Sequence, residues 1–448
     1  MTQDSQKLYN LSRRKMLAGL GAVGLASAGA GLGTSALFSD EEEFSGNVLT
    51  AGTLDLLVDY YSYWDQDIRG VGSVSGTADG PAVTATLADM KPGDSGLLAF
   101  CFTLDDNPAY LWACGDLTAN AENGQTEPEE AAEGTDTDGV GELADSIDVV
   151  VRYCELADDL GQNGFDPEDI VDEGNIMFEG TLAGFLAAAE NGLPLDGAAG
   201  AGILAPGDQS PFAGLRSEGD NPCLCLEWSI DFEGVGNEIQ SDSLMFDLLF
   251  YAEQARHNDG TTNPCITAEQ VESFPNVADD SFDSAFFGKV RNGGGGWELG
   301  VGNGDGNAGG EDNLDYSWPG SGVFDGSFTF DYDGTGAAVL TLFDGSDAQV
   351  AQVGFGDDGG EALAVGDLDG GALSITVGAS GGQLSEVTNL TYNGGSPSVD
   401  TVESTGSVTS LVLSDINTTG GFALAGDLRF EGLGGPSDER PMMTVYVD

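Results

Sequence analysis

Residues 97–104 read LLAFCFTL, and this stretch decides the fold class. Every second residue in it is large and apolar, so one face of an extended chain carries Leu98, Phe100, Phe102 and Leu104. Alternation with a period of two predicts a strand with one face in a core. The same pattern recurs in three further stretches, at 146–154, 224–230 and 244–250. These four strands predict an all-β fold for the first half of the chain.

An export signal precedes these strands. A basic patch, SRRKML at 12–17, leads into a Gly- and Ala-rich apolar run that ends with TSA at 34–36. A basic start, an apolar middle and a small-residue exit predict a secretion signal, here cleaved between Ala36 and Leu37. We therefore expect residues 1–36 to be removed from a secreted, extracellular or cell-surface protein.

Two further expectations concern the route of export and the fate of the segment around the cleavage site. Arg13 and Arg14 suggest twin-arginine export of an already folded chain. The alternative to cleavage is a retained membrane anchor, although the apolar run is marginal for spanning ~30 Å of hydrocarbon. After cleavage, residues 37–44 would be free to pair as a strand with a neighbouring subunit, while 46–56 would belong to the subunit's own sandwich.

Cysteine content points to disulfides. The chain has six cysteines: Cys101, Cys114, Cys154, Cys223, Cys225 and Cys265. An even number in an exported chain favours disulfides, and the fifteen possible pairings stay open. Cys101, Cys154 and Cys225 fall on the strand faces opposite the apolar ones, where cross-strand bridges would lie outside the main core. Zinc is the weaker interpretation, because there is no CxxC pair and His257 is the single histidine.

The charge of the chain excludes some partners. Its 448 residues carry a formal net charge of −63, from 13 basic and 76 acidic side chains. Such a field repels nucleic acid and anionic membranes. Acidic residues spread over the whole length are typical of a halophilic protein, because concentrated salt screens their mutual repulsion within about 3 Å near 1 M.

One helix and two acidic stretches interrupt the strands. Thr181 can cap a helix whose apolar positions are Leu182, Phe185, Leu186 and Ala189, and which Gly192 and Pro194 end. Before it, residues 120–141 and 158–174 read as surface loops rich in oxygen ligands, so calcium could bind there. Neither has EF-hand spacing, and plain acidic loops are the alternative. No other cofactor is indicated.

Four motifs in order resemble those of a known family. They read TSALFSD at 34–40, AGTLDL at 51–56, LADMKPGD at 87–94 and GNEIQSD at 236–242. Residues 1–258 thereby resemble the TasA/camelysin family of exported fibre proteins, which use a dedicated signal peptidase. The resemblance implies a jelly-roll β-sandwich at 37–258 with one inserted helix. It also implies assembly into extracellular filaments or biofilm matrix, in which the freed N-terminal strand complements the next subunit.

The rest of the chain forms a second module. Residues 259–295 are expected to be a linker, and 296–448 a second, Gly-rich β-sandwich of no recognised family. Its short strands include an alternating set, Phe324, Phe328, Phe330 and Tyr332, followed by a DGTG turn at 333–336. Asn389 and Asn417 begin N-x-T sequons and are candidate N-glycosylation sites in an exported chain.

Two features of this module allow a ligand. Residues 303–312 are acidic and Gly-rich and could wrap calcium, while Trp297 and Trp318 could stack on a sugar. The alternative is an acidic loop beside two core or edge aromatic residues. Zinc hydrolysis needs several ligands and a base, often as H-E-x-x-H, and His257 alone cannot supply them.

The leading hypothesis is therefore a structural protein and not an enzyme. We expect a filament or biofilm-matrix subunit from a high-salt organism, whose partners are further copies of itself or other surface and matrix proteins. A surface-displayed module that binds glycans is the first alternative. A metallopeptidase like camelysin is the second.

Overall fold

A computed structural model describes most of the chain after residue 38. The described residues are 39–42, 54–66, 70–78, 90–105, 107–134, 139–157, 160, 164–214, 221–271, 284–293, 296–304, 311–316, 323–356, 363, 368, 371–432 and 440–448. The predicted signal, with Arg13, Arg14, Ala36 and Leu37, lies outside them. Among the described residues, no helix has the length and apolar character needed to cross a membrane.

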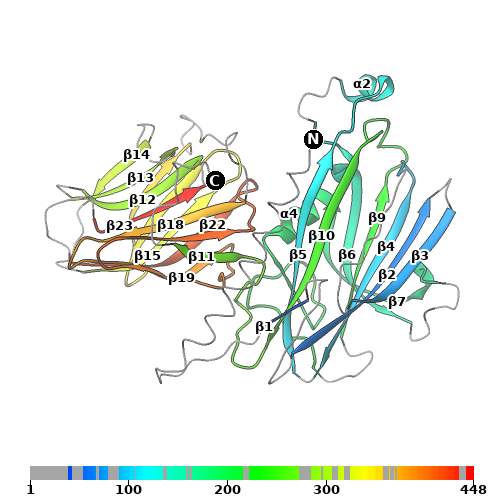
Figure 1. Cartoon of the computed structure of the whole chain (residues 1–448), viewed down its shortest axis with the longest axis horizontal. Coiled ribbons are helices and arrows are strands. Elements are labelled where there is room, and N and C mark those ends of the chain that lie inside the picture. The colour runs from blue at the N-terminus through cyan, green and yellow to red at the C-terminus, as the bar shows by residue number, and fades with distance from the viewer. Residues whose placement is uncertain are drawn as a thin grey trace, which may run out of the picture. The chain divides into compact units, whose positions relative to one another are not determined.

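The first module is a sandwich of two antiparallel sheets (Figure 1). The smaller sheet runs in the order β1 (Ser39–Glu42), β10 (Ser243–Gln254), β5 (Ala109–Ala121) and β8 (Leu193–Leu195). The larger runs β3 (Gly70–Ala78), β2 (Asp55–Gln66), β4 (Ser95–Asp105), β9 (Cys223–Ile230), β6 (Ile147–Leu156) and β7 (Ile170–Thr181). All four strands predicted from alternation are present, as β4, β6, β9 and β10.

The core of this sandwich lies between the two sheets. Phe102 of β4 packs against Phe250 of β10, with ring centroids 5.0 Å apart, and against Phe212 at 5.6 Å. These contacts place the predicted apolar face of β4 toward the opposite sheet. Burial of each such ring stabilises the fold by roughly 2 kcal/mol, which makes the core the main source of stability in this module.

The predicted helix is present as α4 (Leu182–Glu190). The Thr181 hydroxyl accepts a hydrogen bond from the backbone N–H of Gly184 at 3.1 Å, as an N-cap residue should. Its four apolar positions are all buried: Leu182, Phe185, Leu186 and Ala189. Shorter helical segments lie at α2 (Glu127–Glu133), α3 (Leu143–Ser146) and η2 (Pro167–Asp169).

All six cysteines form disulfides, which confirms the prediction and selects the pairing. Cys101–Cys223 and Cys154–Cys225 join β9 to its two neighbours, β4 and β6. Their sulfurs lie with Leu97, Ala99 and Phe165 in a small apolar cluster, separate from the main core, as their position on the opposite strand faces predicted. Cys114–Cys265 joins β5 to the segment that follows β10.

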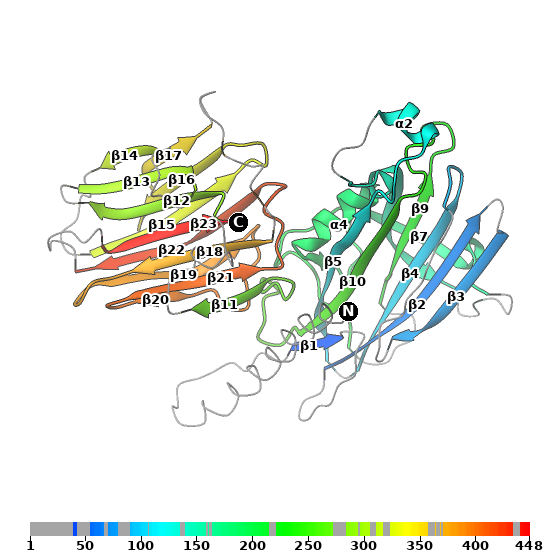
Figure 2. The same ribbon diagram turned by 45° about the horizontal axis from the view of Figure 1, so that its top comes forward.

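The second module is also a sandwich of two antiparallel sheets (Figure 2). One runs β11 (Thr267–Val271), β21 (Val408–Ser414), β18 (Ala372–Gly378), β23 (Met442–Val447), β12 (Phe286–Gly293), β13 (Gly296–Asn303) and β14 (Glu311–Tyr316). The other runs β17 (Gln349–Phe355), β16 (Ala338–Asp344), β15 (Val323–Tyr332), β22 (Phe422–Glu431), β19 (Leu384–Tyr392) and β20 (Val402–Ser404). The all-β class with two sandwiches is thus confirmed.

The predicted linker at 259–295 is wrong in its extent. It contains β11 and β12, and β12 pairs with both β13 and β23 inside the larger sheet. Phe286, Phe287 and Val290 of β12 are buried. Adjacent Phe residues buried on both faces give no alternation, so a short strand among glycines did not stand out in the sequence.

Two tight turns are present, and the second is the predicted DGTG turn at 333–336. In the first, the carboxylate of Asp94 accepts a hydrogen bond from the Lys91 N–H at 3.0 Å, and Gly93 has φ of 96°. In the second, Asp333 accepts from the N–H groups of Thr335 at 2.7 Å and Ala337 at 3.0 Å. Positive φ explains the need for glycine in the first turn, and local carboxylate bonds explain the aspartates in both.

Candidate functional site

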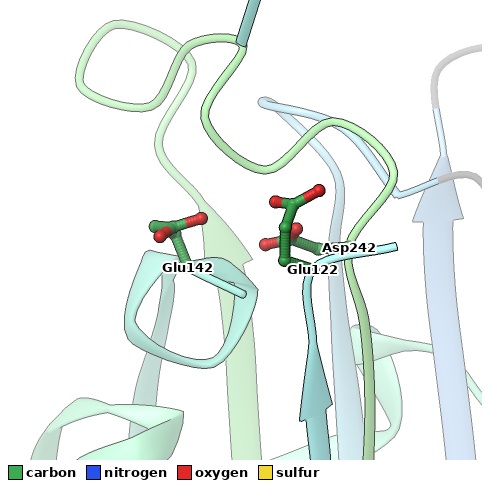
Figure 3. A group of neighbouring side chains, drawn as sticks. All are labelled: Glu122, Glu142 and Asp242. Carbon is green, nitrogen blue, oxygen red and sulfur yellow. The ribbon is translucent and has the colours of Figure 1, made fainter. Parts of the chain in front are cut away.

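Three carboxylates converge at one end of the first sandwich. Glu122, Glu142 and Asp242, here called the acidic cluster, each bring a ligand oxygen to within 4.8 Å of the other two. Figure 3 shows them facing one another from the end of β5, the start of α3 and the loop before β10. The residues of this cluster come from three separate segments, so the fold and not the local sequence brings them together.

Strand pairing fixes two members of the cluster. β5 and β10 are antiparallel, and their register ends with Ala121 opposite Ser243. The next residue outward on each strand is Glu122 on β5 and Asp242 before β10. The register of a sheet therefore places two like charges side by side, where they repel unless a cation or a proton intervenes.

Backbone contacts hold Asp242 in place. Its Oδ2 accepts a hydrogen bond from the N–H of Leu143 at 2.9 Å, which satisfies an N–H group in the first turn of α3. A Cβ on Gly141 would lie 2.8 Å from this carboxylate, so glycine leaves the room that it occupies. Glu142 precedes α3 as its N-cap residue. The short helix and the acidic cluster are thus built as one unit.

Two further residues of this part of the chain have a buried side-chain oxygen without a hydrogen-bond partner. Glu129 of α2 is fully buried, and its Oε2 accepts a hydrogen bond from Thr126 N–H at 2.8 Å, whereas its Oε1 is buried without a partner. Asn120 donates through Nδ2 to the carbonyl of Gly141 at 2.6 Å, and its Oδ1 is likewise buried without a partner. Asn120 shares a strand face with Glu122, two residues on.

Charge crowding changes the protonation of Glu122. Burial, a hydrogen bond with Asp242 and the charges of Glu129 and Asp242 raise its pKa to about 7, against the hydrogen bond from Gly124 N–H. No Lys or Arg among the described residues forms an ion pair with Glu122, Glu129 or Asp242.

A second feature lies near the other end of β10. β1 pairs with it over four residues, from Ser39 opposite Glu253 to Glu42 opposite Phe250. Because β5 occupies the other side of β10, β1 is the edge strand of the smaller sheet. Residues 43–54 separate β1 from β2, and 43–53 of them lie outside the described part of the chain. The segment predicted to pair with a neighbour thus includes a strand that here pairs within its own chain.

Glu253 gives this edge an unusual acid. It is 5% exposed, and its Oε2 accepts a hydrogen bond from Asn258 Nδ2 at 3.2 Å. Burial, aided by the charge of Asp259, raises its pKa to about 7 against the bond from Asn258. Glu253, which lies opposite Ser39 in the β1–β10 pair, is therefore a carboxyl group with a pKa near neutral pH.

The other predicted calcium stretches have different outcomes. Asp166 and Asp169 use their carboxylates to accept backbone N–H groups around η2, which is an ordinary capping arrangement. Most of the stretch at 303–312, namely 305–310, lies outside the described residues. The stretch at 120–141 contributes Glu122 to the acidic cluster.

The predicted glycan and glycosylation residues are placed as follows. Trp297 is buried and stacks on Phe430 with centroids 5.2 Å apart, so it belongs to the core, while Trp318 lies outside the described residues. Asn389 is exposed and donates through Nδ2 to Asp427 at 2.6 Å. Asn417 is half-buried and accepts the N–H of Thr419 at 2.9 Å.

Sequence reasoning missed Glu142 and Asp242 as members of the acidic cluster. Asp242 ends the GNEIQSD motif, which marked only the approach to a strand, and Glu142 follows the acidic stretch by one residue. Their proximity depends on the β5–β10 register, which no local pattern reveals. His257, the single histidine, is exposed in the turn after β10 with φ of 66°.

No protein-family model matches the chain, and no curated protein is significantly similar to it.

Proposed function

We propose that the chain is an exported structural subunit that assembles by exchange of its N-terminal strand. The observation that carries this proposal is β1, a four-residue edge strand paired with β10. Without β1, β10 would be the edge strand and would present unpaired N–H and C=O groups, so it can accept β1 of its own chain or of another copy. Exchange of an identical element keeps the same hydrogen bonds and builds an oligomer at low cost.

Chain length is compatible with such an exchange. Residues 43–54 separate β1 from β2 and span at most roughly 43 Å when extended. A head-to-tail exchange that does not close into a ring extends into a filament. The disulfides fit an oxidising compartment, and the order of motifs that resembles the TasA/camelysin family supports export and processing before assembly.

Electron microscopy of the secreted protein tests the proposal. We expect negative-stain filaments in molar salt for the wild-type chain, and none for the variant Asp40→Pro/Glu41→Pro, because proline cannot donate to the β1–β10 ladder. The matched control is Asp40→Glu/Glu41→Asp, which keeps both charges and both N–H groups and should still form filaments.

Two outcomes would overturn strand exchange. One is a wild-type protein that stays monomeric by light scattering at high concentration in molar salt. The other is a proline variant that forms the same filaments as the control. Circular dichroism of each variant separates lost assembly from lost folding, because β1 contributes only four residues to the sheet.

A further inference from the structure

β3 forms one edge of the larger sheet in the first sandwich. Among the described strands it pairs with β2 alone, from Gly70 opposite Gln66 to Ala78 opposite Val58, without a register shift. Its sequence, GVGSVSGTA, contains no charged residue and no proline. Its two valines are exposed, at positions 71 and 74. A long, regular and uncharged edge of this kind is a template for pairing with a further strand.

The other described edge strands carry features that oppose such pairing. β1, β7, β11, β14 and β20 each contain at least one acidic residue, in a chain with a formal net charge of −63. β8 has only three residues and contains Pro194, and the ladder of β17 shifts register beside Phe343. Charge, proline, short length and bulges are the usual means by which edge strands avoid pairing. β3 has none of them, so its sequence favours contact.

The charge of the chain restricts what can pair with β3. Carboxylates directly opposite one another destabilise a strand pair, so two copies of this chain repel each other at any acidic edge. Two β3 strands would meet without any opposed carboxylates. Asp59 and Asp65 lie on β2, opposite Thr77 and Val71, and would therefore be two strand positions away from the β3 of another copy. An uncharged edge on an acidic chain thus fits the same edge of a second copy.

Two glycines give β3 a self-complementary pattern. A Cβ on Gly72 would lie 2.3 Å from Cζ2 of Trp64, and a Cβ on Gly76 would lie 2.5 Å from the hydroxyl oxygen of Tyr60. The side chains of Trp64 and Tyr60 thus reach over β3 at these positions, on the face that carries Val74. Both glycines are two residues from Val74. An antiparallel pair of β3 strands centred on Val74 therefore places Gly72 of each strand opposite Gly76 of the other.

We propose that β3 binds β3 of a second copy as an antiparallel, two-fold symmetric pair centred on Val74. Neighbouring strands lie about 4.8 Å apart, so Trp64 of one copy would lie beside Tyr60 of the partner subunit, within the range of about 4.5–7 Å that aromatic pairs prefer. Two-fold symmetry repeats this contact on the other side of the paired valines. On the opposite face, Ser73 would lie opposite Ser75 of the partner subunit, where hydroxyl groups can form hydrogen bonds.

This contact goes beyond the strand exchange proposed above and does not depend on it. β3 belongs to the larger sheet, whereas β1 and β10 belong to the smaller one. Strand exchange would connect copies from head to tail, and the two-fold contact would connect one such row of copies to another.

Cysteine variants of the secreted full chain test the register. In Val74→Cys the two new thiols face each other across the two-fold axis, where a Cα separation of about 4.5–5.5 Å permits a disulfide. The matched control is Val71→Cys, at an exposed valine of the same strand, where the two thiols would be six residues apart, or roughly 20 Å. With mild oxidant in molar salt, we expect a covalent dimer of Val74→Cys on a non-reducing gel, and at least about tenfold less for Val71→Cys.

A charge at the centre of the pair should weaken it. Val74→Asp places two carboxylates directly opposite each other, so we expect the dissociation constant of the dimer in sedimentation experiments to rise at least about fivefold. The control Val171→Asp makes the same change at an exposed valine of β7, the other edge of the same sheet, and should dimerise like wild type. Both variants carry Asp40→Pro/Glu41→Pro as well, so that strand exchange does not contribute to the measured mass.

Three results would overturn the proposal. A folded Val74→Cys variant that gives no covalent dimer would mean that another segment, of this chain or of a different protein, covers the edge. Equal dimer bands from the two cysteine variants would indicate random collisions. Equal dissociation constants for the two aspartate variants would place the dimer contact elsewhere. Far-ultraviolet circular dichroism checks the fold of each variant, and if one substitution at Val74 prevents folding, the other one decides.

Discussion

Glu253 shows at the scale of a single residue how burial changes a carboxyl group. Its pKa rises from 4.5 to about 7 in the folded chain, so between these values the folded state holds a proton that the unfolded state has lost. The free energy of unfolding therefore falls as pH rises through this window and levels off above it. At most, about 3 kcal/mol is lost in this way.

Replacement of Glu253 by glutamine removes the titration. We expect Glu253→Gln to unfold at a higher temperature than wild type at pH 8 and to match it near pH 4.5, as measured by circular dichroism at constant salt. The control Glu233→Gln removes an exposed carboxylate of equal charge and should keep the wild-type pH dependence. An unchanged pH dependence in Glu253→Gln would show that this carboxyl group is not the one that titrates.

The β12–β13 hairpin shows at the scale of an element how scarce cations are used. Glu298 of β13 lies opposite Arg291 and contacts it at 3.1 Å, and the nearly buried Lys289 approaches the same carboxylate at 3.3 Å. Burial favours the neutral acid, but the hydrogen bond from Arg291 and the charge of Lys289 outweigh it and lower the pKa of Glu298. One carboxylate thus contacts two cations in the hairpin.

Loss of that carboxylate should destabilise the second sandwich. We expect Glu298→Gln to lower the free energy of unfolding by about 2 kcal/mol, less than for a fully buried pair because Glu298 is partly exposed. The control Glu431→Gln affects an ion pair with Arg429 that is about 40% exposed on both sides, and should cost under about 1 kcal/mol. Urea unfolding of both variants measures the difference, and equal costs would contradict the role assigned to Glu298.

Elements differ in how far the sequence predicts them. β4, β6, β9, β10 and α4 follow from their periodicity, because each buries one face. β5 and β12 show no such periodicity. Leu111, Trp112 and Ala113 of β5 are buried in succession, and so are Phe286 and Phe287 of β12. Alternation predicts on which strand face each of these cysteines lies. Which cysteines form a disulfide depends on the order of the strands in the sheet, which alternation does not reveal. The acidic cluster also depends on strand register, which sequence patterns leave undetermined.

Net charge dominates at the scale of the whole molecule. A formal charge of −63 on 448 residues repels itself in dilute buffer, and compaction increases that repulsion. Salt near 1 M shortens the screening distance to about 3 Å, so the folded state should gain stability with salt until most of the repulsion is screened. Charge repulsion and its screening do not change the packing of the two cores or the disulfides.

Far-ultraviolet circular dichroism tests the salt dependence. We expect strand signal and a high unfolding midpoint in molar potassium chloride, and a lower midpoint or loss of strand signal in dilute buffer. Sucrose serves as a control, because it stabilises folded proteins without screening charge. A spectrum and midpoint that do not change between dilute buffer and molar salt would show that repulsion does not govern the stability of this chain.

The bond between Cys114 and Cys265 decides how the chain would carry mechanical load. Tension that enters through β1 and leaves through the second sandwich follows the shortest covalent path. That path crosses from β5 to Cys265 directly and bypasses the 151-residue separation between the two cysteines. β6, β7, β9 and β10 lie within the bypassed segment. Tension along this path would not extend the backbones of these strands, whereas the load of a strand bound to β10 would still act on β10.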